Sequence, residues 1–213
     1  MMSSTSKAPL LATNARNGAP GEKWGTRPKG YPSPTLYNQA GDRALLIVFG
    51  GPPGVGKTTL AKAVVKKYAA VYLRIDTIEM AIRSANVLRG DVGPAGYVSA
   101  YWVAEENLRL GQVVVADSVN ALQIIRESWA QVARDAQVRL VEVEVICSDA
   151  AEHRRRVESR PPEIDGLRPL TWDGVCERKY EKWSTPHLVI DTARKSVSEA
   201  QYELIERLAG AEH

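Results

Sequence analysis

The sequence predicts an α/β fold, a five-stranded parallel sheet with helices on both faces. From Ala44 onward, short runs rich in β-branched residues alternate with longer stretches of helical periodicity, which is typical of parallel α/β sheets. The first apolar run, ALLIVF, breaks into the glycine-rich stretch GGPPGVGKTT and then into a helical pattern. This order of strand, turn and helix is that of a phosphate-binding loop, so we predict the P-loop NTPase variant of the fold.

The remaining elements follow from the length and period of each apolar pattern. Strands are predicted over 44–49, 70–75, 112–116, 138–147 and 187–190, and helices over 57–68, 77–88, 96–110, 121–136, 149–160, 171–183 and 197–208. Right-handed crossovers between parallel strands would place helices on both faces of the sheet. Because ligands in such sheets bind beyond the carboxyl ends of the strands, the residues just after each strand are the functional candidates.

The glycine-rich stretch satisfies the pattern G-x-x-x-x-G-K-[ST] through Gly51, Gly56, Lys57 and Thr58. Its glycines let successive N–H groups converge on phosphates, and the following helix adds its N-terminal dipole. Lys57 is expected to reach the β/γ-phosphates in catalysis and Thr58 to ligate Mg²⁺. ATP and Mg²⁺ are therefore the predicted cofactors, the alternative being a turn that merely starts a helix. The nucleotide-binding residues predicted here are Gly51, Pro52, Pro53, Gly54, Val55, Gly56, Lys57, Thr58 and Thr59.

Composition and charge narrow the class of protein. The chain has 213 residues, 44% of them hydrophobic, which suffices for one well-buried domain. Its 28 Lys+Arg and 25 Asp+Glu give a net charge of +3, which suits anionic substrates but falls short of a surface that coats nucleic acid. Cys147 and Cys176 lack the spacing of a metal site or disulfide framework, and no apolar run approaches the ~18 residues of a membrane span. We expect a cytoplasmic monomer or homodimer without a membrane partner.

Residues 1–43 differ in composition from the rest of the chain. They are rich in Ser, Pro, Gly, Asn and Lys/Arg and have no sustained period. We predict a flexible N-terminal tail over 1–43 and a single P-loop domain over 44–213. An organellar transit peptide is the alternative for the tail, although it lacks an amphipathic stripe.

Asp76 follows the predicted second strand, in LRIDTIEMAI. A carboxylate there, across from the phosphate loop, could take the proton of an acceptor hydroxyl as it attacks the γ-phosphate. The structural alternative is a capping box, because Glu79 lies three residues on. Arg83, one to two turns further, is a candidate for an anionic group of the substrate, or an exposed helix arginine.

Asp117 ends the predicted third strand, in VVVADSVN. Four apolar residues followed by Asp are typical of a Walker B strand, whose carboxylate orients Mg²⁺. Ser118 stands where hydrolytic P-loop ATPases usually have Glu, which argues against a motor or an AAA+ machine, and the chain has no N-K-x-D motif of a GTPase. Asn120 is a candidate for binding the substrate or for capping the next helix.

The most basic stretch follows the fourth strand and includes HRRRVESR, residues 153–160. Arg156 and Arg160 are four residues apart and so share one face of a helix. In small kinases, arginines on a mobile helical lid close over the transferring phosphoryl group and exclude water. We therefore predict a small lid with Arg156 and Arg160 as catalytic residues, the alternative being a solvated charged helix. His153 is expected to lie on the surface.

Taken in order, five short motifs resemble one branch of the P-loop fold. GGPPGVGKTT, ID after the second strand, ADSVN after the third, RVESR after the fourth and VIDTA at the fifth are similar to kinases that include polynucleotide kinase, chloramphenicol phosphotransferase, zeta-toxin and gluconate kinase relatives. The resemblance runs from about Leu45 to the C-terminus and departs at ADSVN, where polynucleotide kinase-like members tend to read D-x-T-N. The resemblance implies that Asp76 is the acceptor-side carboxylate and that Asp117 and Asn120 form the D-x-[TS]-N-like element after the third strand. It also implies that Arg156 and Arg160 are lid arginines and that Thr192 and Ala193 lie near the adenine.

The function expected from the sequence is an ATP-dependent phosphotransferase that acts on a hydroxyl of a small molecule. Positioning and electrostatics would supply most of the catalysis. Two alternatives stay open. One is a polynucleotide 5′-hydroxyl kinase or repair module, which would need a basic channel. The other is a nucleotide-binding switch without a phosphoryl acceptor.

Overall fold

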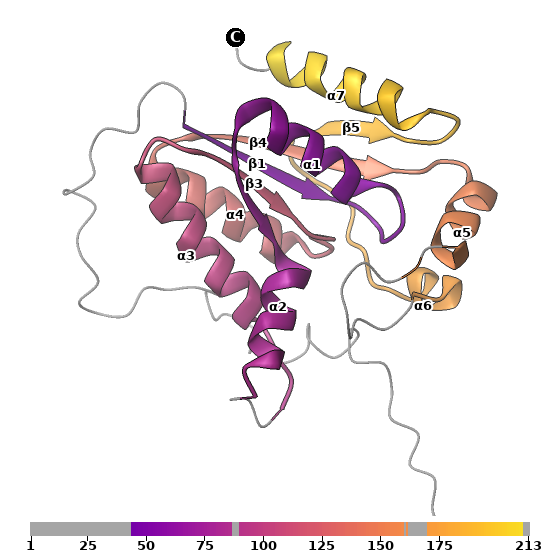
Figure 1. Ribbon diagram of the computed structural model, residues 1–213, viewed down its shortest axis with the longest axis horizontal. Coiled ribbons are helices and arrows are strands. Elements are labelled where there is room, and N and C mark those ends of the chain that lie inside the picture. The colour runs from indigo at the N-terminus through magenta and orange to yellow at the C-terminus, as the bar shows by residue number, and fades with distance from the viewer. Residues whose placement is uncertain (1–43, 87–89, 160, 162–169, 211–213) are drawn as a thin grey trace, which may run out of the picture.

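The computed structural model describes residues 44–86, 90–159, 161 and 170–210. Five parallel strands form one sheet in the order β2-β3-β1-β4-β5 (Figure 1). Their bounds are Leu45–Gly50 for β1, Val71–Arg74 for β2, Val113–Asp117 for β3, Arg139–Ile146 for β4 and Leu188–Asp191 for β5. The predicted α/β fold with a five-stranded parallel sheet is therefore confirmed.

Two pairs of helices cover the sheet, one pair on each face (Figure 1). Helices α1 and α7 lie on one face, and α3 and α4 on the other. Helix α2 directly continues β2 and packs on α3, while α5 and α6 lie together beyond the carboxyl end of β4. The bounds are Lys57–Tyr68 for α1, Ile75–Ser84 for α2, Ala95–Arg109 for α3, Gln123–Ala136 for α4, Ala150–Ser159 for α5, Trp172–Cys176 for α6 and Val197–Gly210 for α7.

The central strand β1 is buried on both faces, as its unbroken apolar run predicts. Ile47 and Phe49 belong to the core beneath α1 and α7, together with Leu60 and Leu204. Leu46 and Val48 point the other way, into a second core that contains Trp129 of α4 and Leu108 of α3. Because both faces are packed, the chain can expose backbone groups to a ligand only beyond the strand ends.

Most predicted helix bounds lie within two residues of the observed ones, and the largest differences are in α2 and α6. Helix α2 begins at Ile75, directly after β2, so that Asp76 lies inside its first turn instead of before it. The helix predicted over 171–183 was wrong beyond Cys176, where α6 ends. Residues 177–187, which we call the strap, are irregular because their polar groups bond to other elements, for example the Glu181 N–H to the carbonyl oxygen of Ala121 at 2.8 Å.

The predicted tail, residues 1–43, lies outside the described residues, so its order and its docking stay predictions. Within the part of the chain that the structure describes, no helix combines the length and the apolar character needed to cross a membrane.

Candidate functional site

The phosphate loop, residues 50–56, connects β1 to α1 and has the backbone geometry of an anion-binding nest. Gly51, Gly54 and Gly56 have positive φ angles of 132°, 84° and 101°. A side chain has no room at Gly51, because a Cβ there would lie 2.1 Å from the carbonyl oxygen of Val145. Left-handed residues spaced in this way turn successive N–H groups toward one point, where a phosphate can bind.

The first turn of α1 completes this anion site. Lys57 is only 8% exposed, and its Nζ donates to the carbonyl oxygen of Pro52 at 2.7 Å, so the ammonium lies over the loop. Thr58 is partly buried, and Thr59 is exposed. No acidic residue occupies this turn to compete with an anion. Loop N–H groups, a helix N-terminus and a lysine thus converge where the triphosphate is predicted.

Asp117, at the end of β3, lies beside Phe49 in the register of the two neighbouring strands. It is 3% exposed, and its Oδ2 accepts a hydrogen bond from the hydroxyl of Tyr72 at 2.7 Å. A carboxylate here and the hydroxyl of Thr58 are oxygen ligands of the kind that Mg²⁺ prefers, with phosphate and water supplying the others. The described residues contain no group of three or more His, Cys, Asp or Glu that could hold a metal by themselves. The two residues therefore fit an ion that arrives with its nucleotide.

Helix α5 is attached to the phosphate loop. The Nε2 of His153 donates to the carbonyl oxygen of Pro53 at 2.7 Å, and its ring packs edge-on against Trp172 of α6, with centroids 5.1 Å apart. Val157, one turn later, covers Gly54, where a Cβ would lie 2.6 Å from its Cγ2. The prediction of a surface histidine was wrong, because His153 is 8% exposed and holds the loop in place.

Arg156, on the same helix, binds the segment that follows β5. Its guanidinium donates to the hydroxyl of Thr192 at 2.8 Å and to the Thr192 carbonyl at 3.0 Å, and it pairs with Glu152. The Thr192 hydroxyl also lies 2.9 Å from the carbonyl oxygen of Val55 and 3.0 Å from that of Ile146. Arg156 thus braces the loop through Thr192, and its predicted contact with a phosphoryl group stays a prediction.

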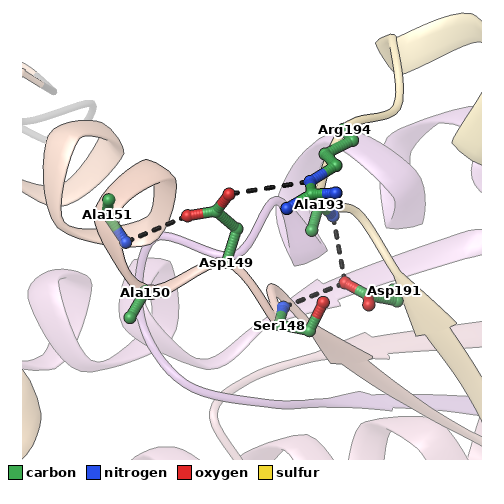
Figure 2. Close-up of a pocket in the computed structure, with 7 residues that line it drawn as sticks. All are labelled: Ser148, Asp149, Ala150, Ala151, Asp191, Ala193 and Arg194. Atoms are coloured by element: carbon green, nitrogen blue, oxygen red, sulfur yellow. Dashed lines mark hydrogen bonds and ion pairs between the residues drawn. The ribbon is translucent and has the colours of Figure 1, made fainter.

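A cavity of about 710 Å³ opens beside these contacts, between the carboxyl ends of β4 and β5 (Figure 2). Of the two residues predicted near the adenine, Ala193 lines this cavity and Thr192 is buried next to it, 6% exposed. The cavity is lined by Ser148, Asp149, Ala150, Ala151, Asp191, Ala193 and Arg194.

Two carboxylates fix the rim of the cavity (Figure 2). Asp191 Oδ1 accepts from the backbone N–H groups of Ser148 and Ala193, both at 3.0 Å. Although partial burial opposes the shift, these hydrogen bonds hold the pKa of Asp191 below its ordinary value, so it stays ionised. Asp149 Oδ2 lies 3.8 Å from the Nε of Arg194, whose side chain is 86% exposed. The planar guanidinium of Arg194 is therefore available at the mouth of the cavity.

Asp76 lies beyond the carboxyl end of β2, on the other side of the phosphate loop. Its side chain is 48% exposed, and its Oδ2 is 3.9 Å from a guanidinium nitrogen of Arg74. The capping role was wrong, because Arg74 occupies the N-cap of α2 and no side chain caps that helix. An open carboxylate at this edge of the sheet lies where parallel α/β folds bind their ligands.

Arg83 has a partner within its own helix. Its guanidinium lies 3.4 Å from a carboxylate oxygen of Glu79, which is 8% exposed. Glu79 packs against Gly96 of α3, where a Cβ would lie 2.5 Å from its Cγ. Burial raises the pKa of Glu79, and the charge of Arg83 opposes this shift. Arg83 thus neutralises a buried carboxylate, and its predicted role in acceptor binding gains no support from this geometry.

Asn120 is fully buried and serves the fold. Its Nδ2 donates to the carbonyl oxygen of Phe49 at 2.6 Å, and its Oδ1 accepts from the Nε1 of Trp129 at 3.2 Å. Both ends of the amide are used inside the protein, in a residue with a φ of 46°. These contacts are those of a residue that supports the fold, so the substrate-binding prediction for Asn120 gains no support from this geometry and stays a prediction. The capping alternative was wrong, because α4 begins only at Gln123.

Similarity to known families agrees with this geometry. The family described as an AAA domain matches residues 46–166, more than half of the chain, from β1 to beyond α5. The chain belongs to the AAA domain family. No protein of curated function matches the sequence significantly.

Solved structures share the fold of this AAA domain at low identity. The APS kinase of Mycobacterium tuberculosis in complex with AMPPNP and APS is 21% identical, with 78% of this chain and 98% of that chain covered and a TM-score of 0.56. The gluconokinase of Sinorhizobium meliloti is 15% identical, with 80% and 99% covered and a TM-score of 0.53. Kti12 of Chaetomium thermophilum in complex with ADP-AlF3 is 18% identical, with 79% and 99% covered and a TM-score of 0.60. At these identities the likeness establishes the fold alone.

Some residues around the site of this AAA domain could not be predicted from the sequence. Tyr72 and His153 carried no signal, because a tyrosine in a strand and a histidine in a basic helix are ordinary residues until their contacts are known. Arg178 of the strap lies in a stretch predicted as helix, and its guanidinium is within electrostatic reach of Asp76. Arg160, the second predicted lid arginine, lies outside the described residues, and its role stays a prediction.

Proposed function

We propose that the protein is an ATP-dependent phosphotransferase that moves the γ-phosphoryl group of ATP to a hydroxyl of a small molecule. One observation carries the proposal: the phosphate loop and the exposed carboxylate of Asp76 lie at the same edge of one sheet. Only β3 separates β2, which leads to Asp76, from β1, which leads to the loop. A donor phosphate on the loop and an acceptor near Asp76 would thus meet above Asp117.

The reaction can be written from these residues. The acceptor hydroxyl oxygen forms a bond to the γ-phosphorus, and the bond from that phosphorus to the β,γ-bridging oxygen breaks, so that its electron pair leaves with ADP. Asp76 takes the hydroxyl proton. Lys57 and the loop N–H groups stabilise the charge on the phosphate oxygens. Mg²⁺ held by Thr58 and Asp117 would neutralise phosphate charge.

The cavity in Figure 2 supports a binding site for the adenosine part of the donor. It adjoins the phosphate loop through Thr192, which bonds to the loop carbonyl of Val55. Arg194 at its mouth can stack on a planar base. In this proposal α5, attached to the loop by His153, forms the base of a lid that excludes water during transfer.

The test is a screen of ADP formation over nucleosides, sugars, aminoglycosides and adenylyl sulfate as acceptors. One class is expected to raise ADP formation above the rate without acceptor, and Lys57→Ala is expected to abolish the increase. Lys62→Ala removes an exposed lysine from the same helix and should leave the rate unchanged. Near-normal turnover in Lys57→Ala would contradict the assignment of the phosphate loop as the nucleotide site.

Assays of nucleotide hydrolysis and of acceptor phosphorylation also test two other functions. Nucleotide binding with hydrolysis that only a protein partner stimulates would indicate a switch, the alternative that the sequence leaves open. Phosphorylation of an oligonucleotide 5′-hydroxyl, with binding that falls steeply with salt, would indicate a polynucleotide kinase.

A further inference from the structure

Tyr72 of β2 contacts the carboxylate at the end of β3, and the reaction written above gives it no role. Its hydroxyl donates to the Oδ2 of Asp117 at 2.7 Å. A phenol carries one O–H donor, and an ionised carboxylate can only accept, so the direction of the bond is fixed. The bond thus joins the edge strand β2 to the residue that is predicted to ligate Mg²⁺.

The register of the strands places the two side chains on the same face of the sheet. Tyr72 pairs with Val115 of β3, two residues before Asp117. Val115 belongs to the core beneath α1, and Tyr72 packs against that core. Because side chains alternate along a strand, Asp117 projects from the same face as Val115. Asp117 and the helix that carries Thr58 therefore lie on one side of the sheet (Figure 1).

The hydrogen bond orients a buried carboxylate. Asp117 is only 3% exposed, and burial of a carboxylate is costly unless it is hydrogen-bonded, paired or bound to a metal. A tyrosine side chain has only two torsion angles, and the ring of Tyr72 is packed against the core, so its hydroxyl has few alternative positions. The orientation of Asp117 is thus set before a nucleotide binds, which lowers the entropy that binding would cost.

A bond at Oδ2 leaves Oδ1 as the oxygen that Asp117 presents to an ion. Carboxylates that ligate metals are held by outer hydrogen bonds of this kind, which orient them and tune their affinity. Contact through one oxygen suits Mg²⁺, which keeps several waters in near-octahedral geometry, whereas Ca²⁺ often takes both oxygens of a carboxylate. The bond from Tyr72 therefore favours Mg²⁺ over Ca²⁺ at Asp117.

We propose that Tyr72 is a positioning residue for the metal, which holds Asp117 so that one carboxylate oxygen faces the Mg²⁺ of the bound nucleotide. The alternative is a bond that only satisfies a half-buried phenol. Its removal would then change stability but not the response to the metal. This inference rests on the nucleotide and metal part of the proposed function and does not depend on the phosphoryl acceptor.

The test is the affinity of the full chain for AMPPNP, measured by titration calorimetry with excess Mg²⁺ and again with EDTA. Tyr72→Phe keeps the ring and removes only the donor. The variant should bind AMPPNP about 10-fold more weakly in Mg²⁺, the lower end of the usual cost of losing an outer partner of a metal ligand. Its affinity in EDTA should equal that of the wild type, whereas a general loss of structure would weaken both alike.

Metal selectivity gives a second measurement that needs no turnover. Binding of Mn²⁺ to the AMPPNP complex is followed by electron paramagnetic resonance, and Mg²⁺ and Ca²⁺ are added as competitors. The ratio of Mg²⁺ affinity to Ca²⁺ affinity should be higher in the wild type than in Tyr72→Phe, because the variant leaves both oxygens of Asp117 open to Ca²⁺. An equal ratio in the two proteins would overturn the inference.

Tyr101→Phe is the matched control. It removes a buried tyrosine hydroxyl, bonded to the carbonyl oxygen of Ile125 at 3.4 Å, from the core on the other face of the sheet. AMPPNP affinity should be unchanged in this variant, with Mg²⁺ and with EDTA.

A double-mutant cycle checks that Tyr72 acts through Asp117. Asp117→Asn alone should weaken AMPPNP binding in Mg²⁺, and the addition of Tyr72→Phe should cause little further loss, because the two changes remove parts of one contact. Losses that simply add would contradict the inference, as would an equal loss in Mg²⁺ and EDTA in Tyr72→Phe.

The outcomes separate this inference from the proposed function. If wild-type protein binds AMPPNP equally well with Mg²⁺ and with EDTA, the role of Tyr72 fails and the nucleotide site stands. If no hydroxyl compound raises ADP formation while the effect of Mg²⁺ still depends on Tyr72, the phosphotransferase proposal fails and the role of Tyr72 stands. Absence of AMPPNP binding under both conditions would overturn both.

Discussion

The Nε2 of His153 lies 2.7 Å from the carbonyl oxygen of Pro53, across 100 residues of sequence. A carbonyl can only accept, so the Nε2 carries the proton, and the first turns of α5 are tied to the middle of the phosphate loop. The ring is held edge-on against Trp172. This contact fixes the loop before nucleotide binds, and it makes the shape of the loop depend on the position of the helix.

Replacing His153 with Phe keeps a ring against Trp172 but removes the hydrogen bond to the loop. We expect a loss of about 1 kcal/mol in the free energy of unfolding, the usual net value of one such bond. Because the loop is then less ordered, the Kd for ATP should rise by roughly 3- to 10-fold by the same energy scale. Urea unfolding and titration calorimetry measure the two effects. His187→Phe, before β5, serves as the control and should leave ATP affinity unchanged; equal affinities in wild type and His153→Phe would contradict the role of the contact.

Asp76→Asn distinguishes a kinase from a protein that only binds ATP. If Asp76 is the base, kcat with the stimulating acceptor should fall by roughly 10²- to 10⁴-fold while ATP binding persists. Stability should change little, because Asp76 does not cap α2 and its charge in the first turn contributes only about 0.3–1 kcal/mol. Steady-state kinetics and thermal unfolding give both values. Glu106→Gln, at an exposed position of α3, should change neither, and an unchanged kcat in Asp76→Asn would mean that the acceptor binds elsewhere.

Asn120→Ala tests whether this residue belongs to the fold or to the acceptor site. Its removal leaves the Phe49 carbonyl and the Trp129 indole N–H buried without their partners, which should cost roughly 2–4 kcal/mol. For a domain of this size each kcal/mol lowers Tm by about 2–4 °C. Asn107→Ala, which removes an exposed bond to the Val103 carbonyl, should have a small effect. A stable Asn120→Ala protein with a raised KM for the acceptor would support the substrate-binding prediction.

Glu142 on β4 predicts a dependence of stability on pH. Burial raises its pKa above the ordinary value of 4.5, and the hydrogen bond from the Thr185 hydroxyl at 2.8 Å opposes the shift. The folded state therefore holds the proton more tightly than the unfolded chain, so this group stabilises the fold below pH 4.5 and the contribution is lost as pH rises through the raised value.

Glu142→Gln removes this titration. The variant should gain stability relative to wild type between pH 4.5 and neutral pH, and the difference should not grow further once the folded pKa has been passed. Urea unfolding at pH 4, 5.5 and 7 measures it, with the exposed Glu106→Gln as the control. A stability difference that is the same at all three pH values would show that Glu142 has no shifted pKa.

The local pattern of residues determined the sheet, the phosphate loop and the presence of the helices, but not the start of α2 or the end of α6. An apolar run followed by glycines and Lys57 is compatible with few structures other than a phosphate loop. Positive φ, close approach to phosphate and the start of a helix are all required within a few residues. The alternation of strand and helix patterns likewise determined the layers, since right-handed crossovers leave little choice of topology. The position of Asp117 followed from the same logic, as the polar residue that ends a buried strand.

Only the tertiary structure decided which polar residues serve the fold and which face a ligand. Asn120 and Arg83 have the residue types of a binding site, but their polar groups bond inside the protein. Asn120 bonds to Phe49 and Trp129, and Arg83 pairs with Glu79. His153 looks like a surface residue in sequence, yet it lies against the phosphate loop. Contacts between residues far apart in sequence depend on packing and on irregular segments such as the strap. Such segments have no hydrophobic periodicity from which their course could be predicted.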